Sequence, residues 1–388
     1  MKIAKKVLAL FLAAVMVIGF TACGKANEPE AADNETIRIA YCIPLTGNLK
    51  GLGEHYKEGS DHAIAEINEN GGILGKNVEA VYIDALDTTQ TMTNAIKLAL
   101  DDPTISCCYV LGYTSTCVAV CPFLEASKMP TLVSGSNEAI VDLHNNYIWQ
   151  HRVLDGYSGV AMANFTAQEL QAKNIAIVYL TNQSCTAQKD VMYNTLKENG
   201  VIVPEDNMIA VAEEESNLAP IVAQLKAMDP DCVMLQMTPD PLGLFANAAA
   251  DGGLDCDFIG PATMNQGACL NVAGSNVNGW YTVAEYMPTN DTEANKSFVS
   301  GFQARFGHDP DATVVYGYDS TYLFAEAMKL SGDPSNREAI NTALGQIKDL
   351  ELASGTYNAY EDHTYIDRLT IAQIQDGVAN FIEMIQYR

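Results

Sequence analysis

Short apolar runs alternate with amphipathic stretches along the chain from Thr36 onward. Runs such as ISCCYVL and DCVMLQM are apolar almost throughout, which is typical of strands buried on both faces of a parallel sheet. The stretches between them carry apolar residues at helical spacing and end in turn residues such as Gly71-Gly72. The first block predicts strands over 36–43, 77–84, 105–111 and 130–134, with helices over 52–70, after 87–88 and from about 115.

The same alternation restarts after Arg152. A third, mostly helical block follows over 291–348. Alternating strands and helices predict a doubly wound α/β fold, whose ligand crevice lies beyond the carboxyl ends of the strands. About 350 residues exceed the size at which one core keeps growing, so two lobes are expected. The predicted helices cover 157–171, 187–199, 216–228 and 241–251, and the strands 174–180, 201–211, 231–237 and 257–260, with short ones near 355–360 and 369–374.

The first 23 residues have the pattern of an export signal. Lys2, Lys5 and Lys6 precede an apolar run over 7–20, and small residues lead to Cys23. The segment resembles a bacterial lipobox, although Phe20 stands where Leu is usual. We therefore expect a lipoprotein signal peptide over 1–22, a lipid on Cys23, a polar tether over 23–35, and an extracytoplasmic protein anchored to the cell membrane.

Charge and cysteine usage narrow the function further. The formal net charge is −26, and cleavage before Cys23 would make it −29 by removing three lysines and no acids. Such a chain repels phosphates, so no nucleic acid partner is expected. The nine cysteines after Cys23 are scattered and often lie inside predicted strands, which favours small buried hydrophobic residues over a disulfide framework.

The catalytic motifs that a sequence can reveal are missing. The chain has no G-x-S-x-G, H-E-x-x-H, C-x-x-C or phosphate-binding loop, and its six histidines form no spaced cluster. We expect no enzyme activity, no cofactor and no metal. A surface-anchored hydrolase built from scattered residues stays open as the least favoured alternative.

Several segments, in order, resemble the branched-chain amino acid type of periplasmic substrate-binding proteins, which feed ABC importers. They are the IPLTG opening, INENGGILGK, YVLGYTSTC, NIAIVY, FIGPATM and YGYDS. The resemblance extends over essentially the whole chain after the tether. The resemblance implies a small solute as ligand and ABC permease subunits as partners, and a ligand sensor on the same fold is the alternative.

The resemblance also implies a type I periplasmic-binding fold, with two doubly wound parallel-sheet lobes joined by a three-strand hinge. By this analogy lobe 1 takes 36–154 and 286–346, and lobe 2 takes 155–285 and 347–388. The ligand lies between the lobes, and its contacts with both would favour closure about the hinge.

Two loops of the first lobe are candidates for holding the ligand. The loop after strand 105–111 opens a helix, whose N–H groups and partial positive charge favour a carboxylate. The alternatives are that Ser115 or Thr116 only caps this helix, and that the second loop only makes a turn. The candidate residues are Tyr113, Ser115 and Thr116 in the first loop and Ser134, Gly135, Ser136 and Asn137 in the second.

The second lobe offers Gln183 and Ser184, Gln236, and Thr263 after successive strands. Ala262 stands where several relatives in the family place a Glu that pairs with the ligand's ammonium. Asp240 and Asp319 lie in candidate loops and could replace it, and Asp319 is taken as a site residue. Amino acids, amides, ureas, aromatic acids and small peptides therefore all stay open as ligands. We expect Arg152 to tie the hinge backbone or an acid such as Asp155 rather than to bind ligand.

Overall fold

The computed structural model describes residues 36–47, 49–86, 88–366 and 368–386, without the side chains of Gln183 and Gln386. The chain divides into a unit over 1–36 and a unit over 37–388, and all helices and strands below belong to the second. The expected signal peptide, tether and lipid site at Cys23 lie outside the described residues.

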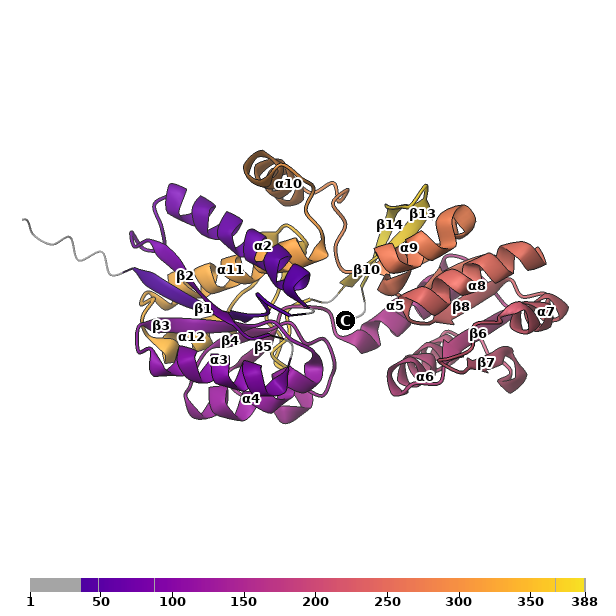
Figure 1. Ribbon diagram of the computed structural model, residues 1–388, viewed down its shortest axis with the longest axis horizontal. Helices are drawn as coiled ribbons and strands as arrows, with labels where there is room; N and C mark the ends of the chain where they lie inside the picture. The colour runs from indigo at the N-terminus through magenta and orange to yellow at the C-terminus, as the bar shows by residue number, and fades with distance from the viewer. Residues whose placement is uncertain (1–35, 48, 87, 367, 387–388) are drawn as a thin grey trace, which may run out of the picture. The chain divides into compact units, whose positions relative to one another are not determined.

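The first sheet is entirely parallel, as the apolar runs predict (Figure 1). Its order is β2-β1-β3-β4-β5, and every residue of β3 is buried. Its strands are β1 (Ile37–Ile43), β2 (Val78–Asp84), β3 (Ile105–Val110), β4 (Thr131–Val133) and β5 (Ile148–Gln150).

Alternate residues of β1 pack on helices on the two faces of this sheet. Tyr41 belongs to the core that includes Phe324 of α11, whereas Cys42 belongs to a second core with Ile96 of α3 and Val120 of α4. Figure 1 shows α11 and α12, from the last third of the chain, beside the sheet together with α2. The helices are α2 (Lys50–Glu69), α3 (Thr89–Asp101), α4 (Thr114–Ala126), α10 (Glu293–Phe306), α11 (Ala312–Ser331) and α12 (Arg337–Leu344).

Close packing of α2 against α11 explains the glycine of the YGYDS segment. A Cβ added to Gly317 would overlap the backbone carbonyl of Tyr56 in α2. The neighbouring Tyr41 hydroxyl makes a 2.8 Å hydrogen bond with Thr321 of α11. The glycine of this segment therefore serves the core of the first lobe.

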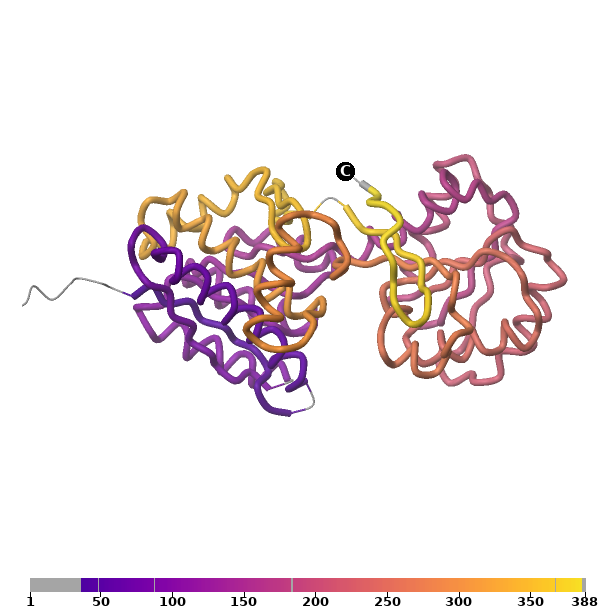
Figure 2. Tube along the Cα trace, turned by 90° about the horizontal axis from the view of Figure 1, so that it is seen from above, coloured from indigo at the N-terminus to yellow at the C-terminus, as the bar shows by residue number. Residues whose placement is uncertain are grey.

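The second sheet is mixed, with the order β14-β13-β10-β9-β8-β6-β7. Five of its strands run parallel, and β13 and β14 extend it as an antiparallel hairpin. Figure 2 shows this hairpin in yellow beside the segments in magenta and orange. The elements are β6 (Ile175–Leu180), β7 (Met208–Val211), β8 (Cys232–Gln236), β9 (Asp257–Gly260), β10 (Tyr281–Ala284), β13 (Arg368–Gln375) and β14 (Val378–Gln386), with α5 (Asp155–Gln168), α6 (Gln183–Glu198), α7 (Ala219–Met228), α8 (Pro239–Gly252) and α9 (Gly267–Ala273).

The described elements confirm the α/β prediction with a few corrections. The strand predicted over 201–211 begins only at Met208, because Pro204 has no N–H for a ladder and a 3-10 turn, Glu205–Asn207, follows it. Strands β5, β10, β11 (Leu350–Leu352) and β14 and helix α9 were not predicted. All nine cysteines of the described residues are free, and only Cys256 is not buried.

The chain crosses three times between the elements of the first sheet and those of the second sheet: after β5, after β10 and before β13. Strand β11 pairs with β12 (Gly355–Tyr357) in a small separate sheet. Leu352 of β11 and Tyr357 of β12 pack in the core beside the first sheet. The expected division at 346/347 stays a prediction, and this packing favours a last crossing near Ile366 instead.

Candidate ligand-binding cleft

Two loops meet where β3 and β4 end side by side. The Ser134 hydroxyl accepts a 2.9 Å hydrogen bond from the Gly112 N–H and lies 3.0 Å from the Gly112 carbonyl oxygen, to which it can donate. Ser134 is buried. These bonds hold the first loop against the second and fix where α4 begins.

The N-terminus of α4 is not capped by a side chain. Tyr113 is its N-cap and makes no capping bond, while its carbonyl accepts from Thr116 and Cys117. No hydrogen bond to the N–H of Thr114 or Ser115 occurs within the described part of the chain. A helix start with free donors carries partial positive charge and is suited to an anionic group.

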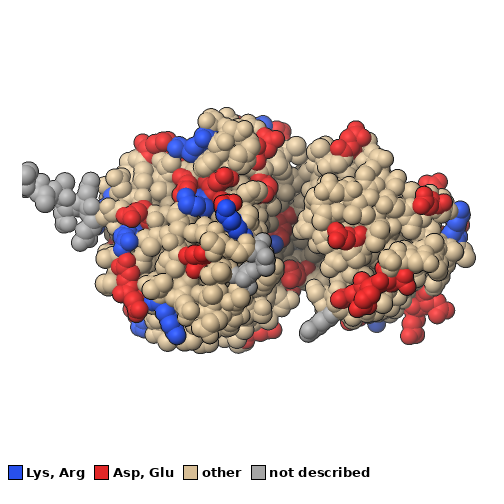
Figure 3. Space-filling view, viewed as in Figure 1, with Lys and Arg blue, Asp and Glu red and all other residues tan. Residues whose placement is uncertain are grey.

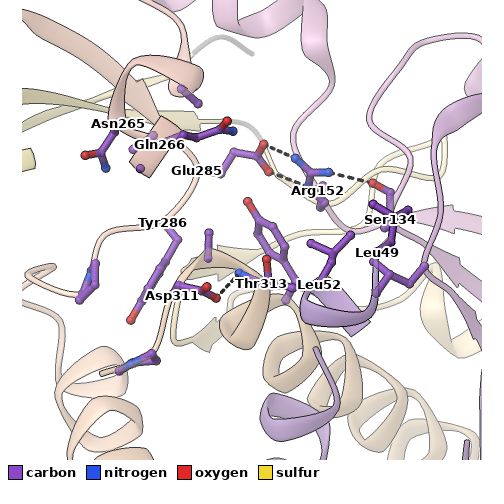
Figure 4. Close-up of a pocket in the computed structure, with 18 of the residues that line it drawn as sticks. Leu49, Leu52, Ser134, Arg152, Asn265, Gln266, Glu285, Tyr286, Asp311 and Thr313 are labelled. Carbon is purple, nitrogen blue, oxygen red and sulfur yellow. Dashed lines mark hydrogen bonds and ion pairs between the residues drawn. The ribbon is translucent and has the colours of Figure 1, made fainter. Parts of the chain in front are cut away.

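An ion pair joins the first crossing to the end of β10. Arg152 donates to both carboxylate oxygens of Glu285, at 3.0 Å from Nε and 2.6 Å from Nη2, and its Nη1 donates to the Ser134 carbonyl at 3.0 Å. Figure 4 shows these bonds at the edge of the cavity. The guanidinium also lies 4.8 Å from the centre of the Tyr316 ring. Arg152 therefore has the structural role that the sequence predicts, but its acid is Glu285 rather than Asp155.

The neighbouring His151 is electrically neutral. It is fully buried, and its Nε2 lies 2.8 Å from the Tyr109 hydroxyl. Burial first, and then the nearby Arg152, lowers the pKa of His151 to about 3. The ion pair therefore carries the fixed charge at this crossing.

A cavity of about 760 Å³ lies beside the ion pair (Figure 4). Its volume is in the range of small-molecule sites. From the first lobe it takes Gly112, Tyr113 and Ser134, and from the other side Ala262 and Glu285. Its other lining residues include Leu49, Leu52, Arg152, Asn265, Gln266, Tyr286, Asp311, Thr313 and Tyr316.

Asp311 forms part of the rim of this larger cavity. Its carboxylate accepts from the N–H groups of Thr313 and Val314, at 2.9 and 3.0 Å, and caps α11. Its other oxygen lies 2.7 Å from Nδ1 of His55 in α2. Asp311 is therefore already engaged in joining α2 to the start of α11.

A smaller cavity of about 250 Å³ adjoins the carboxyl ends of the parallel strands in the second sheet. The side-chain oxygens of Gln188, on α6, and Gln236, at the end of β8, are buried there without a hydrogen-bond partner. Thr263 is engaged, because its hydroxyl donates to the Met237 carbonyl at 2.9 Å. Both cavities are lined by Arg152, Ala262, Gln266, Val283, Ala284 and Glu285.

The structure brings five of the predicted side chains to these cavities. Tyr113 and Ser134 line the larger one, and Ser184, Gln236 and Thr263 line the smaller one. The side chain of Gln183 lies outside the described residues.

Five further candidates belong to the two loops but do not line either cavity. Ser115 is exposed and Thr116 is buried. The Gly135 carbonyl accepts a 2.7 Å bond from Gln150, and the Ser136 carbonyl accepts from the Asp155 N–H. The side chain of Asn137 accepts from Ala139 within its own turn.

Asp319 is not brought to the cleft, which corrects its assignment as a site residue. It is fully buried in α11 and accepts hydrogen bonds from the N–H groups of Ala353 and Ser354 and from the hydroxyls of Ser354 and Tyr357. These donors hold the β11–β12 segment on the first lobe. Asp240 is exposed in the first turn of α8 and lines neither cavity.

The sequence reasoning missed Glu285, Tyr286 and Gln266. All three follow or flank elements that were not predicted, since β10 is only four residues long and α9 only seven. Glu285 could have been found from the sequence, because it is an acidic residue that directly follows the short run YTVA.

The described residues include no group of three His, Cys, Asp or Glu side chains that could hold a metal ion. Nor does any helix in the described ranges combine the length and apolar character that a membrane span requires.

The charged side chains are distributed unevenly on the face drawn in Figure 3. Lysine and arginine lie mainly over the elements of the first sheet, and the charged groups over the elements of the second sheet are mostly acidic.

Comparisons with known proteins agree with this architecture. The family described as periplasmic binding protein matches residues 36–379. The leucine-, isoleucine-, valine-, threonine- and alanine-binding protein of Pseudomonas aeruginosa is 25% identical over 331 residues, which are 84% of this chain and 85% of the relative.

Two solved structures share the fold. The branched-chain amino acid transporter substrate-binding protein LivJ from Streptococcus pneumoniae, in complex with isoleucine, aligns with a TM-score of 0.74 and 21% identity over 90% of this chain and 99% of its own. A solute-binding protein of an ABC transporter from R. palustris, in complex with benzoate, aligns with a TM-score of 0.71 and 17% identity over 91% of this chain and 97% of its own. These relatives are binding proteins rather than enzymes, which agrees with the expected absence of catalysis.

Proposed function

Because the chain belongs to the periplasmic binding protein family, a family of extracytoplasmic substrate-binding proteins of ABC transporters, we propose that it captures a small amino-acid-like solute in the cleft and delivers it to the permease subunits of an importer. One observation carries the proposal: the larger cavity is lined by residues of both lobes, among them Tyr113, the residue directly before the uncapped start of α4. Relatives named for the branched-chain amino acids that they bind support this solute class.

The first lobe would hold the solute's carboxylate. Within the described residues the N–H groups of Thr114 and Ser115 have no hydrogen-bond partner at this helix start, and Ser134 fixes the loop before them. Tyr113 would cover the solute, since its side chain is 63% exposed at the cavity. Ser184, Gln236 and Thr263 would contribute from the second lobe.

Binding would favour closure of the lobes. A solute that contacts both lobes stabilises the arrangement in which both contacts exist, and only that difference in affinity can shift the equilibrium. The three chain crossings would form the hinge. The lobes would comprise 36–154 with 286 to about 366, and 155–285 with the C-terminal hairpin.

Aromatic carboxylic acids are the second candidate ligand class. Tyr113, Tyr286 and Tyr316 line the larger cavity, and aromatic rings pack well against one another. The benzoate complex of a protein with this fold supports the same candidate.

A thermal-shift screen of the purified protein over amino acids, amides and aromatic acids tests the proposal. A solute present at 100 times its dissociation constant should add about 2.7 kcal/mol to the free energy of unfolding. A solute that is consumed during incubation would instead favour a hydrolase. Absence of any shift across the screen would contradict the solute-binding proposal.

We also propose that export and lipidation at Cys23 keep the protein at the membrane that holds its permease. The signal pattern over 1–22 supports this, and the polar stretch that follows would act as a tether. Cys23→Ser should move the protein from the membrane fraction to the soluble extracytoplasmic fraction, and mass spectrometry should find acyl chains on the wild-type N-terminal cysteine only. Membrane retention of the variant would contradict the anchor.

A further inference from the structure

A further cavity, of about 400 Å³, lies on the first lobe outside the cleft. Residues from the segments 140–150 and 361–363 line it, and none of them lines either cavity of the cleft. We propose that this cavity is a separate binding site for a small organic cation, whose ammonium or guanidinium group donates hydrogen bonds to Gln150 Oε1, His363 Nε2 and the Glu361 carboxylate. The site is distinct from that of the transported solute.

The cavity lies where the chain segments before the first and last crossings run side by side. The N–H of Gln150 donates to the His363 carbonyl at 2.8 Å, and Gln150 also forms a parallel bridge with Thr364. Gln150 is the last residue of β5, directly before the first crossing, and His363 shortly precedes the crossing near Ile366. A ligand in this cavity would therefore contact both segments.

Gln150 supplies a buried acceptor that bonds no described residue. The residue is only 1% exposed, and its Oε1 is inaccessible to solvent. Its Nε2 donates to the Gly135 carbonyl at 2.7 Å and lies 3.4 Å from the Asn137 carbonyl oxygen, so these two acceptors fix which end of the amide is the oxygen. A buried acceptor without a partner is costly, and a donor from a ligand would remove this cost.

His363 supplies a second acceptor. Its Nδ1 lies 3.1 Å from the Ile148 carbonyl oxygen, which can only accept, so Nδ1 carries the proton. Burial lowers the pKa of His363, which keeps the ring neutral and leaves Nε2 as an acceptor. The ring stacks on Trp149, with centroids 4.0 Å apart and planes within 8° of parallel. This stacking fixes the position of Nε2 at the cavity.

The charges of the lining also favour a cation. Glu361 and Asp362 are acidic, and no lysine or arginine lines the cavity within the described structure. The Glu361 side chain is exposed and makes no hydrogen bond or ion pair with a described residue. The side-chain N–H groups of Asn145 and Asn146, which could donate to a ligand, already bond acceptors of the protein. The cavity therefore offers acceptors and negative charge, which attract a cation and repel an anion.

Fluorescence titration with three four-carbon probes tests the site. The probes are the dication of 1,4-diaminobutane, the neutral 1,4-butanediol and the dianion succinate. The chain has two tryptophans, so Trp280→Phe leaves Trp149, beside His363, as the reporter. We expect a saturable change of emission with the diamine, an apparent dissociation constant at least about 10-fold higher with the diol, and no saturation with succinate.

Variants locate the amine, with isothermal titration as the measurement. Gln150→Met removes the buried oxygen and should weaken diamine binding by about 10-fold or more. His363→Phe keeps an aromatic ring against Trp149 and should weaken binding by about 5- to 10-fold.

Glu361→Gln should weaken diamine binding by about 2- to 5-fold, because the carboxylate is exposed. Its matched control is Glu198→Gln, an exposed glutamate of α6, which should keep wild-type affinity. Since Glu361 lies on the surface, this variant also decides the matter if a buried variant does not fold.

Three outcomes would overturn the cation site. The first is diamine binding that none of the three variants weakens, which would place the amine elsewhere on the protein. The second is equal affinity for the diamine and the diol, or a preference for succinate. The third is absence of saturation by the diamine below about 10 mM. Each of them leaves solute capture in the cleft untouched, because the thermal-shift screen tests that proposal separately.

Discussion

The two sides of the cleft differ in which hydrogen-bonding groups they leave free. On the first-lobe side the polar groups of the loops already bond one another, as Ser134 does with Gly112, and among the described residues the pair of N–H donors at α4 has no partner. On the second-lobe side Gln188 and Gln236 have buried acceptors that bond no described residue, next to Asp155. One side therefore offers donors and the other acceptors.

This difference gives the cleft a polarity. A solute with an anionic end and a cationic end satisfies both sides at once, whereas a solute with one kind of end leaves a side unpaired. The Arg152–Glu285 pair separates the two sides and is neutral as a pair.

Arg152→Ala should have the largest effect on stability. It leaves Glu285 largely buried, with a side chain that is 17% exposed, and without its cation. Losing one partner of a buried pair is costly, so the free energy of unfolding should fall by about 3 kcal/mol, and solute affinity should fall with it. Urea unfolding and isothermal titration measure the two effects.

Arg305→Ala is the matched control, because Arg305 pairs with Glu69 on the surface. Its cost should be below about 1 kcal/mol. Equal losses in the two variants would show that the cleft ion pair is no more important than a surface pair.

Asp319→Asn should lower the free energy of unfolding by about 2 kcal/mol, because an amide nitrogen would face donors where a carboxylate oxygen accepts. Solute affinity should stay within two-fold of wild type, since Asp319 lines neither cavity. A large loss of affinity would show that Asp319 contributes to solute binding.

The difference in stability between the wild type and Asp319→Asn should depend on pH. Burial raises the pKa of Asp319 from 3.8 to about 6. The native state then binds its proton more tightly than the unfolded chain, so this group makes the wild type less stable as pH rises from about 4 to about 6. The stability difference between wild type and Asp319→Asn should therefore shrink over that window, and growth of the difference would contradict the assignment.

Ser134→Ala should have the smallest of the three effects. It removes the hydroxyl that bonds Gly112 and should lower the free energy of unfolding by about 1 kcal/mol and weaken solute binding several-fold. Ser127→Ala, at the exposed end of α4, should change stability by less than about 0.5 kcal/mol. Identical behaviour of the two variants would show that Ser134 does not fix the first-lobe side of the cleft.

Patterning predicted strands that are apolar runs between turn residues and missed two strands that are not. The wholly buried β3 and the exact bounds of β9, Asp257–Gly260, follow from apolar runs between turn residues. Strands β5 and β10 are IWQ and YTVA, and each includes a polar residue, Gln150 or Thr282, in so short a segment that no apolar run is visible. The β13–β14 hairpin could have been predicted, because Asp376-Gly377 has the positive φ angles of 52° and 76° that such a two-residue turn favours.

The site was predictable as a set of loops but not as a set of contacts. Strand ends located Tyr113, Ser134 and Gln236, because the carboxyl ends of parallel strands share an edge. No sequence rule could tell that Asp319 points into the core or that Arg152 pairs with Glu285, 133 residues away. Nor does a sequence reveal that the oxygen of Gln188 is buried without a partner.

A crystal structure of the protein with the solute that raises its melting temperature most would show how the solute lies between the two sides of the cleft. We expect a solute in the cleft, with its carboxylate at the N–H groups of Thr114 and Ser115 and its nitrogen within hydrogen-bond distance of Asp155 or Gln236. A solute bound in the opposite orientation, or away from both cavities, would contradict it.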